Sequence, residues 1–426
     1  MALMNRRPAI GLVTLLALLV GGGIAAHGGH GRAGHLPTLV LTAAMRSVAR
    51  PDRAPGTPGT GSIVPERAEL QGRQLVQRLA DGRRVVFTLD PVLQQQANAL
   101  LRDYEVPYGA IVMYELQTGA LLVLAGRSQR DPRLGSRELC LTPWAPAASV
   151  YKLITASALL SRGVSADAPV CYHGGLRELQ LDNLRNQPRL DRTCHSLADA
   201  VAHSINPVVA KLAARYLDRA ALIDWSARFG FNRPIPFELA VTPSSAEIPD
   251  TELELARTAA GFWHTAISPL HGAVIAGVAA SGGLLRWPHL LRDGGTGTTS
   301  VAAGTVDEGA EATATAALPR VLDLRVAARL TAMMTRTTTQ GSGRRGFIGR
   351  GGRPYLPTLP VAGKTGSLAR RDPQLDYSWF VGFAPADRPE VAFAVLLANP
   401  PAWRIKASTA ARLLLERYVS RRRSRG

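Results

Sequence analysis

Apolar residues form one long run near the amino end and many short periodic segments further along the chain. Residues 9–26 carry no charge, follow two arginines and end in glycine and alanine. The run is at the short end of what crosses a bilayer, so residues 1–30 are predicted to be a membrane anchor, with a cleaved signal peptide as the alternative. Both options place the remaining chain outside the cytoplasm. The next residues are dense in Gly, Pro and Thr, and residues 31–82 are predicted to be a linker.

Periodic patterns begin near residue 82. Residues 84–89 predict a short strand, Asp90 an N-cap, and residues 92–104 an amphipathic helix. The apolar runs 109–116 and 120–125 are separated by a Gln-Thr-Gly turn, which predicts a β-hairpin.

The carboxyl half contains both helical and strand-like patterns. Helices are predicted at 208–216, 322–339 and 407–418, and strands at 359–368, 377–384 and 390–397. Strands at both ends of the chain with helices between them predict an α/β (α+β) fold, with one mixed sheet closed by a strand pair from the amino side. The Gly/Thr/Ala tract at 294–317 is predicted to be a flexible surface insertion, and residues 421–426 a basic tail.

Composition and charge narrow the class of protein. The chain has 426 residues and 46% hydrophobic content, enough for one large domain or two ordinary ones. Its formal net charge is +18, but the arginines are spread along the sequence without a helix-turn-helix, zinc-finger or aromatic-basic pattern. No nucleic-acid partner is therefore predicted. Attraction to anionic lipid or to an anionic polymer explains the same charge.

Three cysteines fit neither a zinc site nor a disulfide-dense scaffold, because none lies within four residues of another. Cys171 and Cys194 bracket a polar, loop-like stretch. They form one disulfide if the compartment is oxidising, and two free buried thiols are the alternative. Cys140 is left over in both cases.

A serine and a lysine three residues apart are the first candidate for chemistry. Ser149 and Lys152 precede an apolar helix-forming run, and residues three apart share one face of a helix. An amine in that position can take the proton of the hydroxyl, which activates a serine nucleophile. Only four of the 50 basic residues are lysine, and arginine cannot lose its proton in a protein. The alternative is a surface lysine near a serine N-cap.

Two further motifs supply complementary groups. Ser204 and Asn206 precede a helix that starts with proline, and they offer a hydroxyl and an amide that both donates and accepts. Lys364, Thr365 and Gly366 lie in a predicted edge strand, with a cation, a hydroxyl and a position without a side chain where a ligand backbone can approach. Taken singly, the first motif also fits a helix cap and the second a strand-edge turn.

In this order, Ser-x-x-Lys, Ser-x-Asn and Lys-Thr-Gly resemble the signature of penicillin-binding proteins and related serine acyltransferases. Residues 267–270, 279–283 and 379–384 also resemble their transpeptidase domain, and the likeness covers residues 83–420. It implies a β-lactamase/transpeptidase-like fold: a mixed, mainly antiparallel sheet flanked by helices, with an all-helical subdomain. It further implies a serine-type D,D-transpeptidase in the cell envelope that needs no cofactor or metal. The partners implied are peptidoglycan stem peptides, β-lactams as inhibitors, the membrane and unidentified cell-wall synthesis proteins.

The resemblance also assigns roles to residues. Ser149 is the expected nucleophile, Lys152 its base and Ser204 a proton relay toward the leaving amine. A positive charge on Lys364 is expected to lower the pKa of Lys152. Substrate binding is implied for Asn206, Lys364, Thr365, Gly366 and Ser367, with the backbone N–H groups of Ser149 and Ser367 as the oxyanion hole.

Two positions depart from the family pattern. Ala148 stands where many relatives have glycine, and Ser367 where many have threonine. About 80 residues before the domain are too few for a glycosyltransferase domain, so a monofunctional protein is expected. Open alternatives on the same fold are a D,D-carboxypeptidase, a serine β-lactamase and an idle peptidoglycan-binding or sensor domain. One class of serine β-lactamase uses a glutamate for deacylation, in a loop that also carries an Asn. The candidates in this chain are Glu247, Glu252 and Glu254, and none of them has that Asn nearby.

Overall fold

The computed structural model describes residues 63–292, 317–371 and 374–423, and its centre is a five-stranded sheet. In chain order the strands are β4 (Tyr108–Glu115), β5 (Leu121–Arg127), β11 (Ala362–Arg371), β12 (Gln374–Ala384) and β13 (Val391–Asn399). Their order across the sheet is β11-β12-β13-β4-β5, and every neighbouring pair is antiparallel. The sequence predicts a mixed sheet, whereas these five strands are antiparallel throughout. The hairpin from the amino side does close the sheet beside β13.

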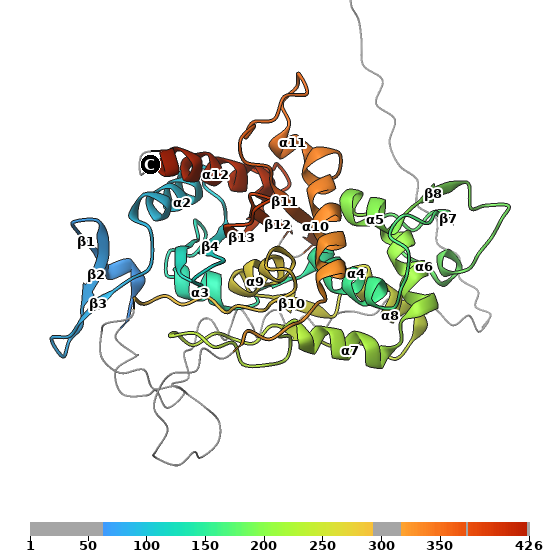
Figure 1. The fold of residues 1–426 in the computed structure, drawn as a ribbon, viewed down its shortest axis with the longest axis horizontal. Helices are drawn as coiled ribbons and strands as arrows, with labels where there is room; N and C mark the ends of the chain where they lie inside the picture. Colours follow the sequence, from blue (N-terminus) through green and yellow to red (C-terminus); the bar gives the residue numbers. More distant parts are fainter. Residues whose placement is uncertain (1–62, 293–316, 372–373, 424–426) are drawn as a thin grey trace, which may run out of the picture.

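Helices cover both faces of this sheet and form a helical region beside β11 (Figure 1). They are α2 (Pro91–Asp103), α3 (Ser136–Leu141), α4 (Lys152–Ser161), α5 (Leu197–His203), α6 (Asn206–Tyr216), α7 (Arg219–Arg228), α8 (Glu252–Ala259), α9 (Pro269–Ala280), α10 (Leu324–Thr339), α11 (Arg344–Phe347) and α12 (Ala407–Arg423). Helix α9 packs on one face of the sheet, and α2 and α12 pack on the other. Helices α4 to α8 form the helical region, and α10 contacts both that region and β11.

Shorter elements complete the fold. They are the strands β1 (Glu69–Gln71), β2 (Gln74–Arg78), β3 (Arg84–Val86), β6 (Ala145–Pro146), β7 (Val170–Tyr172), β8 (Thr193–His195), β9 (Ser245–Ala246) and β10 (Thr265–Ile267), and the 3₁₀ turns η2 (Pro65–Arg67), η3 (Ala148–Val150) and η4 (Leu181–Leu184). Strands β1, β2 and β3 form one small sheet, β6, β10 and β9 form a second, and β7 pairs with β8.

Strand β13 is buried along its whole length because it lies in the middle of the central sheet. Successive side chains of a strand point to opposite faces. Ala394 and Leu396 therefore pack in the core under α9, whereas Phe393 and Val395 pack in the core under α12. A strand that is covered on both faces has a nearly continuous apolar sequence. For this reason the sequence pattern predicted β13 well.

The predicted linker ends earlier than the sequence indicated. Strands β1 and β2 lie within residues 63–82, which the sequence assigned to the linker. Strand β2 pairs with β3 through Val76 and Val86, and the Val64 N–H donates to the Gln77 side chain at 2.9 Å. Strands this short are not stable without a partner strand. Their sequence alone therefore gives little indication that they are strands.

The predicted basic tail begins inside a helix. Helix α12 continues to Arg423, past the expected boundary at residue 421. Arg421 forms an ion pair with the buried Asp90, and Arg422 pairs with Glu390 at 2.9 Å. Asp90 caps the start of α2 and Glu390 directly precedes β13, and these acidic partners hold the start of the basic tail against the domain.

Several predictions lie outside the described residues: the anchor at 1–30, the linker up to residue 62 and all but the last residue of the insertion at 294–317. Within the described ranges, no helix has the length and apolar character to cross a bilayer. Cys171 and Cys194 form a disulfide between β7 and β8, which decides between the two alternatives left open by the sequence. Cys140 is free and buried.

Candidate active site

Ser149 and Lys152 lie on consecutive helical turns at the edge of the helical region. Ser149 belongs to η3, and Lys152 is the first residue of α4. Lys152 Nζ lies 2.8 Å from Ser149 Oγ, as the three-residue spacing predicted. Ala148 has a φ of 48°, in the left-handed region that favours glycine. The position where many relatives carry glycine thus keeps a glycine-like backbone, although the residue is alanine.

Lys152 is fully buried. Its Nζ donates to Asn206 Oδ1 at 2.7 Å and to the Ala260 carbonyl at 2.5 Å. Burial lowers the pKa of Lys152 well below its ordinary value, and the charge of Lys364 lowers it further. The sequence predicted only the effect of Lys364, whereas burial is the larger cause. A lowered pKa favours the neutral amine that can accept a proton from Ser149.

Lys364 comes from β11, far along the chain, and is also fully buried. Its Nζ donates to Ser204 Oγ at 3.1 Å and to the Thr365 carbonyl at 2.8 Å, and burial lowers its pKa to about 7. Ser204 directly follows α5 and has a φ of 63°, and Asn206 begins α6 after one intervening residue. This sharp turn between α5 and α6 directs the hydroxyl and the amide to the same centre.

Strand β11 lies against the turn that carries Ser149, and the lack of a side chain at Gly366 permits this close approach. A Cβ at that position would be 3.1 Å from Trp379 Cβ and 3.3 Å from a methyl group of Val150. The Thr365 hydroxyl lies 2.5 Å from the Ser342 hydroxyl, and Ser367 is exposed one residue beyond Gly366. A side chain at Gly366 would therefore push the edge strand away from Ser149.

These groups surround a cavity of about 270 Å³. It is lined by Ser149, Ser204, Asn206, Ser342, Thr365, Ser367, Ser378, Trp379, Trp403, Lys406 and Ser408. Five of these were predicted as site residues from the sequence. Two further predicted residues lie behind the lining, where Lys152 contacts Ser149 and Lys364 contacts Ser204. Among the described residues no Asp or Glu lines the cavity, so it is suited to an anionic ligand.

Sequence reasoning missed six of the lining residues: Ser342, Ser378, Trp379, Trp403, Lys406 and Ser408. Two of them had a usable signal. Ser342 lies between two glycines directly after a predicted helix, and Lys406 is one of only four lysines. Ser378, Trp403 and Ser408 have no local signal, because only the packing of β12 and α12 beside β11 brings them to the cavity.

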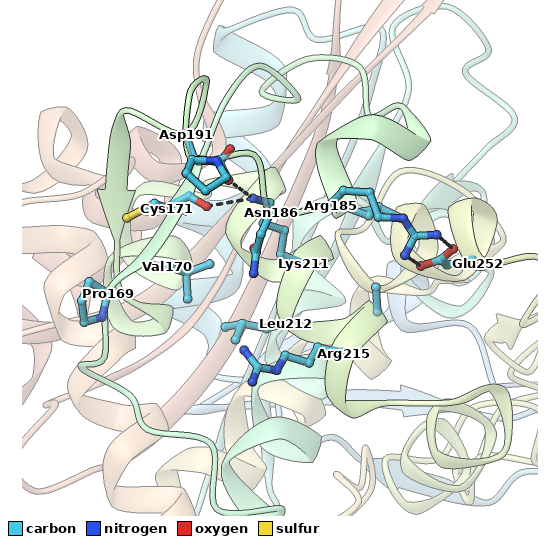
Figure 2. Close-up of a pocket in the computed structure, with 13 residues that line it drawn as sticks. Pro169, Val170, Cys171, Arg185, Asn186, Asp191, Lys211, Leu212, Arg215 and Glu252 are labelled. Carbon is cyan, nitrogen blue, oxygen red and sulfur yellow. Dashed lines mark hydrogen bonds and ion pairs between the residues drawn. The ribbon is translucent and has the colours of Figure 1, made fainter.

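A larger pocket of about 720 Å³ lies beside the β7–β8 hairpin and contains a buried ion pair (Figure 2). Lys211 Nζ of α6 donates to Asp191 at 2.7 Å and to the Cys171 carbonyl at 2.9 Å. The same loop supplies the Leu176 carbonyl, which accepts from Asn206 Nδ2 at 2.6 Å. The segment between β7 and β8 therefore holds the Asn206 amide in place.

Residues 109–415 match the family model of the penicillin binding protein transpeptidase domain. The chain belongs to this family. The resemblance inferred from the three motifs and the predicted fold class are thereby confirmed.

Other members of this penicillin-binding family are similar to the chain. Peptidoglycan D,D-transpeptidase PbpA of Mycobacterium tuberculosis is 29% identical, covering 79% of this chain and 74% of that protein. Stage V sporulation protein D of Bacillus subtilis is 24% identical, covering 75% and 50%. The imipenem acyl-enzyme complex of penicillin-binding protein A from M. tuberculosis has a TM-score of 0.62 and 26% identity, covering 79% of each chain. A D,D-transpeptidase domain from Eggerthella lenta, with a TM-score of 0.60 and 19% identity over 82% of this chain and 96% of that one, supports the fold alone.

Proposed function

We propose that this penicillin-binding protein is a serine-type D,D-transpeptidase that crosslinks peptidoglycan stem peptides and is acylated by β-lactams. One observation carries the proposal. Ser149 Oγ lies 2.8 Å from the amine of a fully buried lysine with a lowered pKa, at a cavity that no Asp or Glu of the described residues lines. A nucleophile, a neutral base and an anion-binding surface are the parts that this acyl transfer requires.

Acylation begins at Ser149. Its Oγ attacks the carbonyl carbon between the two D-alanines of a stem peptide, and Lys152 Nζ takes the hydroxyl proton. The oxyanion accepts hydrogen bonds from the backbone N–H groups of Ser149 and Ser367. As the C–N bond breaks, Ser204 Oγ gives its proton to the leaving nitrogen and takes one from Lys364, 3.1 Å away. The terminal D-alanine leaves, and the remaining peptide is an ester of Ser149.

The second half of the reaction runs the same proton path in reverse. An amine of a neighbouring stem peptide attacks the ester carbonyl and gives a proton back through Ser204 to Lys364. Lys152 returns its proton to Ser149 Oγ as the C–O bond breaks. The terminal carboxylate of the donor binds at Thr365 and the charge of Lys364, and Asn206 holds the donor amide.

A glutamate-assisted β-lactamase is disfavoured by the contacts of the candidate acids. Glu254 accepts from Arg257 at 2.6 Å and lies 3.2 Å from His264 Nε2, while Glu252 pairs with Arg185. Neither lines the active-site cavity. Within the described part of the chain, a water positioned to hydrolyse the ester therefore has no carboxylate base at the cavity.

The location proposed for the enzyme is the outer side of the cytoplasmic membrane, held by a single amino-terminal span, with other cell-wall synthesis proteins as partners. The uncharged run at 9–26 supports the span. The Cys171–Cys194 disulfide fits an oxidising compartment outside the cytoplasm. Fractionation of cells that make the full chain tests this: recovery in the soluble cytoplasm would contradict it.

Benzylpenicillin is expected to form one covalent adduct with the purified full chain. Intact-mass measurement should show the addition of one penicillin, and peptide mapping should place it on Ser149. A penicillin adduct that persists, together with transfer of a stem-peptide acyl group to an added amine, supports a transpeptidase. Rapid hydrolysis of free penicillin would favour a lactamase, transfer of a stem peptide to water alone would favour a carboxypeptidase, and the absence of any adduct would overturn the proposal.

Acylation is expected to have a bell-shaped pH dependence. Lys152 must be neutral to accept a proton, so the rate falls at acidic pH, where this amine is protonated. Lys364 must be charged to hold the carboxylate, and its pKa is about 7. The second-order rate constant for benzylpenicillin should therefore decline above about pH 7, because it reports the free enzyme. At saturating penicillin the alkaline limb should move to higher pH, since the bound carboxylate stabilises the charge.

The Lys364→Arg variant separates the acidic limb of the pH–rate profile from the alkaline limb, because arginine keeps its charge at high pH. This variant is expected to lose the alkaline limb and to keep the acidic one, at a lower rate throughout, because arginine does not give up the proton that Ser204 takes from Lys364. A wild-type rate that stays constant from pH 7 to about 9 would contradict the assignment of Lys364.

A further inference from the structure

The active-site cavity carries a cation that the acyl-transfer steps do not use. Lys406 lines the cavity together with Ser149 and Thr365, and its side chain is exposed. Only four of the 50 basic residues of the chain are lysine, and two of the others, Lys152 and Lys364, belong to the catalytic centre.

The position of Lys406 is fixed by contacts on both of its sides. Ser378 pairs with Ser367 across β12 and β11, and its Oγ accepts from the Ala407 N–H at 3.1 Å. On the other side, Lys406 Nζ lies 5.3 Å from the ring centre of Trp403. The Trp403 indole donates to Asp376 at 2.7 Å, which holds the ring in place. The backbone next to Lys406 is therefore held beside β12, and the amine lies over the Trp403 ring at the cavity.

The charge of Lys406 is not neutralised within the described part of the chain. It forms no ion pair with any Asp or Glu there, and no acidic residue lines the cavity. Asp376, the acid linked to Trp403, accepts the indole N–H. A cation held at an acid-free cavity attracts an anionic group of the ligand.

The ligand group that reaches Lys406 differs from the terminal carboxylate. That carboxylate is assigned to Thr365. Ser367 lies two residues further along β11, and two residues of an extended strand span about 7 Å. A donor peptide that lies along the β11 edge with its carboxyl end at Thr365 extends past Ser367. Its residues on the amino side of the two D-alanines then pass Ser378 and Lys406.

We propose that Lys406 binds a second carboxylate of the acyl donor. The enzyme then favours stem peptides in which the residue before the two D-alanines carries a free side-chain carboxylate, over peptides in which that group is an amide or is missing. This inference rests on the proposed function, because the second carboxylate is placed relative to the first. A charge-assisted hydrogen bond from an ammonium to a carboxylate supplies the preference.

Two penicillins that share one scaffold test the proposal. Carbenicillin is benzylpenicillin with one added carboxylate on the acyl side chain, the part that replaces the donor residues. The measurement is the ratio of the two second-order acylation rate constants, carbenicillin over benzylpenicillin, in each variant of the full chain. In Lys406→Gln the ratio should fall about tenfold, the usual effect of losing one hydrogen bond to a charged group. Lys406→Arg should retain most of the ratio, because it keeps the charge.

Arg404→Gln is the matched control. Arg404 is an exposed cation two residues away that pairs with Glu105 at 3.6 Å and does not line the cavity. This variant should keep the wild-type ratio. The ratio should also shrink with added salt in the wild type and not in Lys406→Gln, since salt screens exposed charges.

Either of two other results would contradict a second carboxylate site at Lys406. An unchanged ratio in Lys406→Gln means that the added carboxylate does not meet Lys406. An equal loss for both penicillins means that Lys406 acts on the shared carboxylate or on the fold. Failure of the proposed function looks different, because the wild type would then be acylated by neither penicillin. Donor peptides that differ only in a free or amidated carboxylate before the D-alanines should repeat the ratio measured with penicillins.

Discussion

Replacement of Lys152 by methionine is expected to slow acylation of Ser149 by about 10³-fold, within the range for loss of a general base. Methionine nearly matches the length and volume of lysine, so the buried space remains filled. What is lost is the amine 2.8 Å from Ser149 Oγ, together with its bonds to Asn206 and the Ala260 carbonyl. Stopped-flow or intact-mass kinetics with benzylpenicillin measure the rate, and thermal unfolding confirms that the variant folds.

Lys152→Arg distinguishes a base from a charge. Arginine supplies hydrogen bonds and a positive charge, but it does not lose its proton. If Lys152 acts as a neutral base, the arginine variant should be as slow as the methionine variant. Acylation by Lys152→Arg at close to the wild-type rate would show that the neutral amine is not needed and would remove the base from the mechanism.

Replacement of Lys211 by methionine is expected to lower the free energy of unfolding by about 3–5 kcal/mol, the cost of leaving one partner of a buried ion pair alone. The side chains of Lys211 and Asp191 are 4% and 6% exposed, and their charged atoms are 2.7 Å apart. Without Lys211, Asp191 keeps its buried charge with only His173 and a backbone N–H beside it. Urea or thermal unfolding of the isolated protein measures the change.

Arg185 provides the control in the same pocket (Figure 2). It pairs with Glu252 at 2.7 Å, but the two side chains are 58% and 38% exposed. Arg185→Met should therefore cost at most about 1 kcal/mol. The double variant Lys211→Met/Asp191→Asn should recover part of the loss, because no unpaired charge remains. A loss in Lys211→Met as small as that in Arg185→Met would contradict a buried pair.

The pH dependence of stability gives a second sign of the same pair. Burial raises the pKa of Asp191, but hydrogen bonds from Lys211, His173 and the Gln187 N–H outweigh burial and hold it at about 2. A folded-state pKa below the ordinary value of 3.8 stabilises the protein above that value, and the stabilisation is lost as the pH falls toward 2. Lys211→Met should weaken or reverse this dependence between about pH 4 and pH 2.

Local patterns in the sequence determined much of this protein. The Ser149–Lys152 pair could be predicted because residues three apart meet on any helical turn, whatever surrounds it. The buried strand β13 could be predicted because a strand covered on both faces forms a nearly continuous apolar run. The residue types of the three motifs were sufficient to indicate the family, since their order along the chain is itself informative.

The tertiary structure decided which distant groups meet. Lys364 and Ser204 are 160 residues apart, and their contact depends on the packing of β11 against the helical region. Lys406 reaches the cavity only because α12 begins beside Ser378, and no local pattern indicates that neighbour. Strands β1 and β2 form because each finds a partner, and a segment of this length does not hold an extended shape alone.

The sequence also indicated Lys152 as the candidate catalytic amine without fixing its chemistry. A lysine is a strong cation in water and a base only where burial disfavours its charge. Which of the four lysines are buried depends on which distant segments pack over each of them. For Lys152 these include the Ala260 carbonyl and Asn206, which lie 108 and 54 residues away along the chain. The sequence therefore supplied the groups, and the packing of the whole chain set their pKa values and brought them into contact.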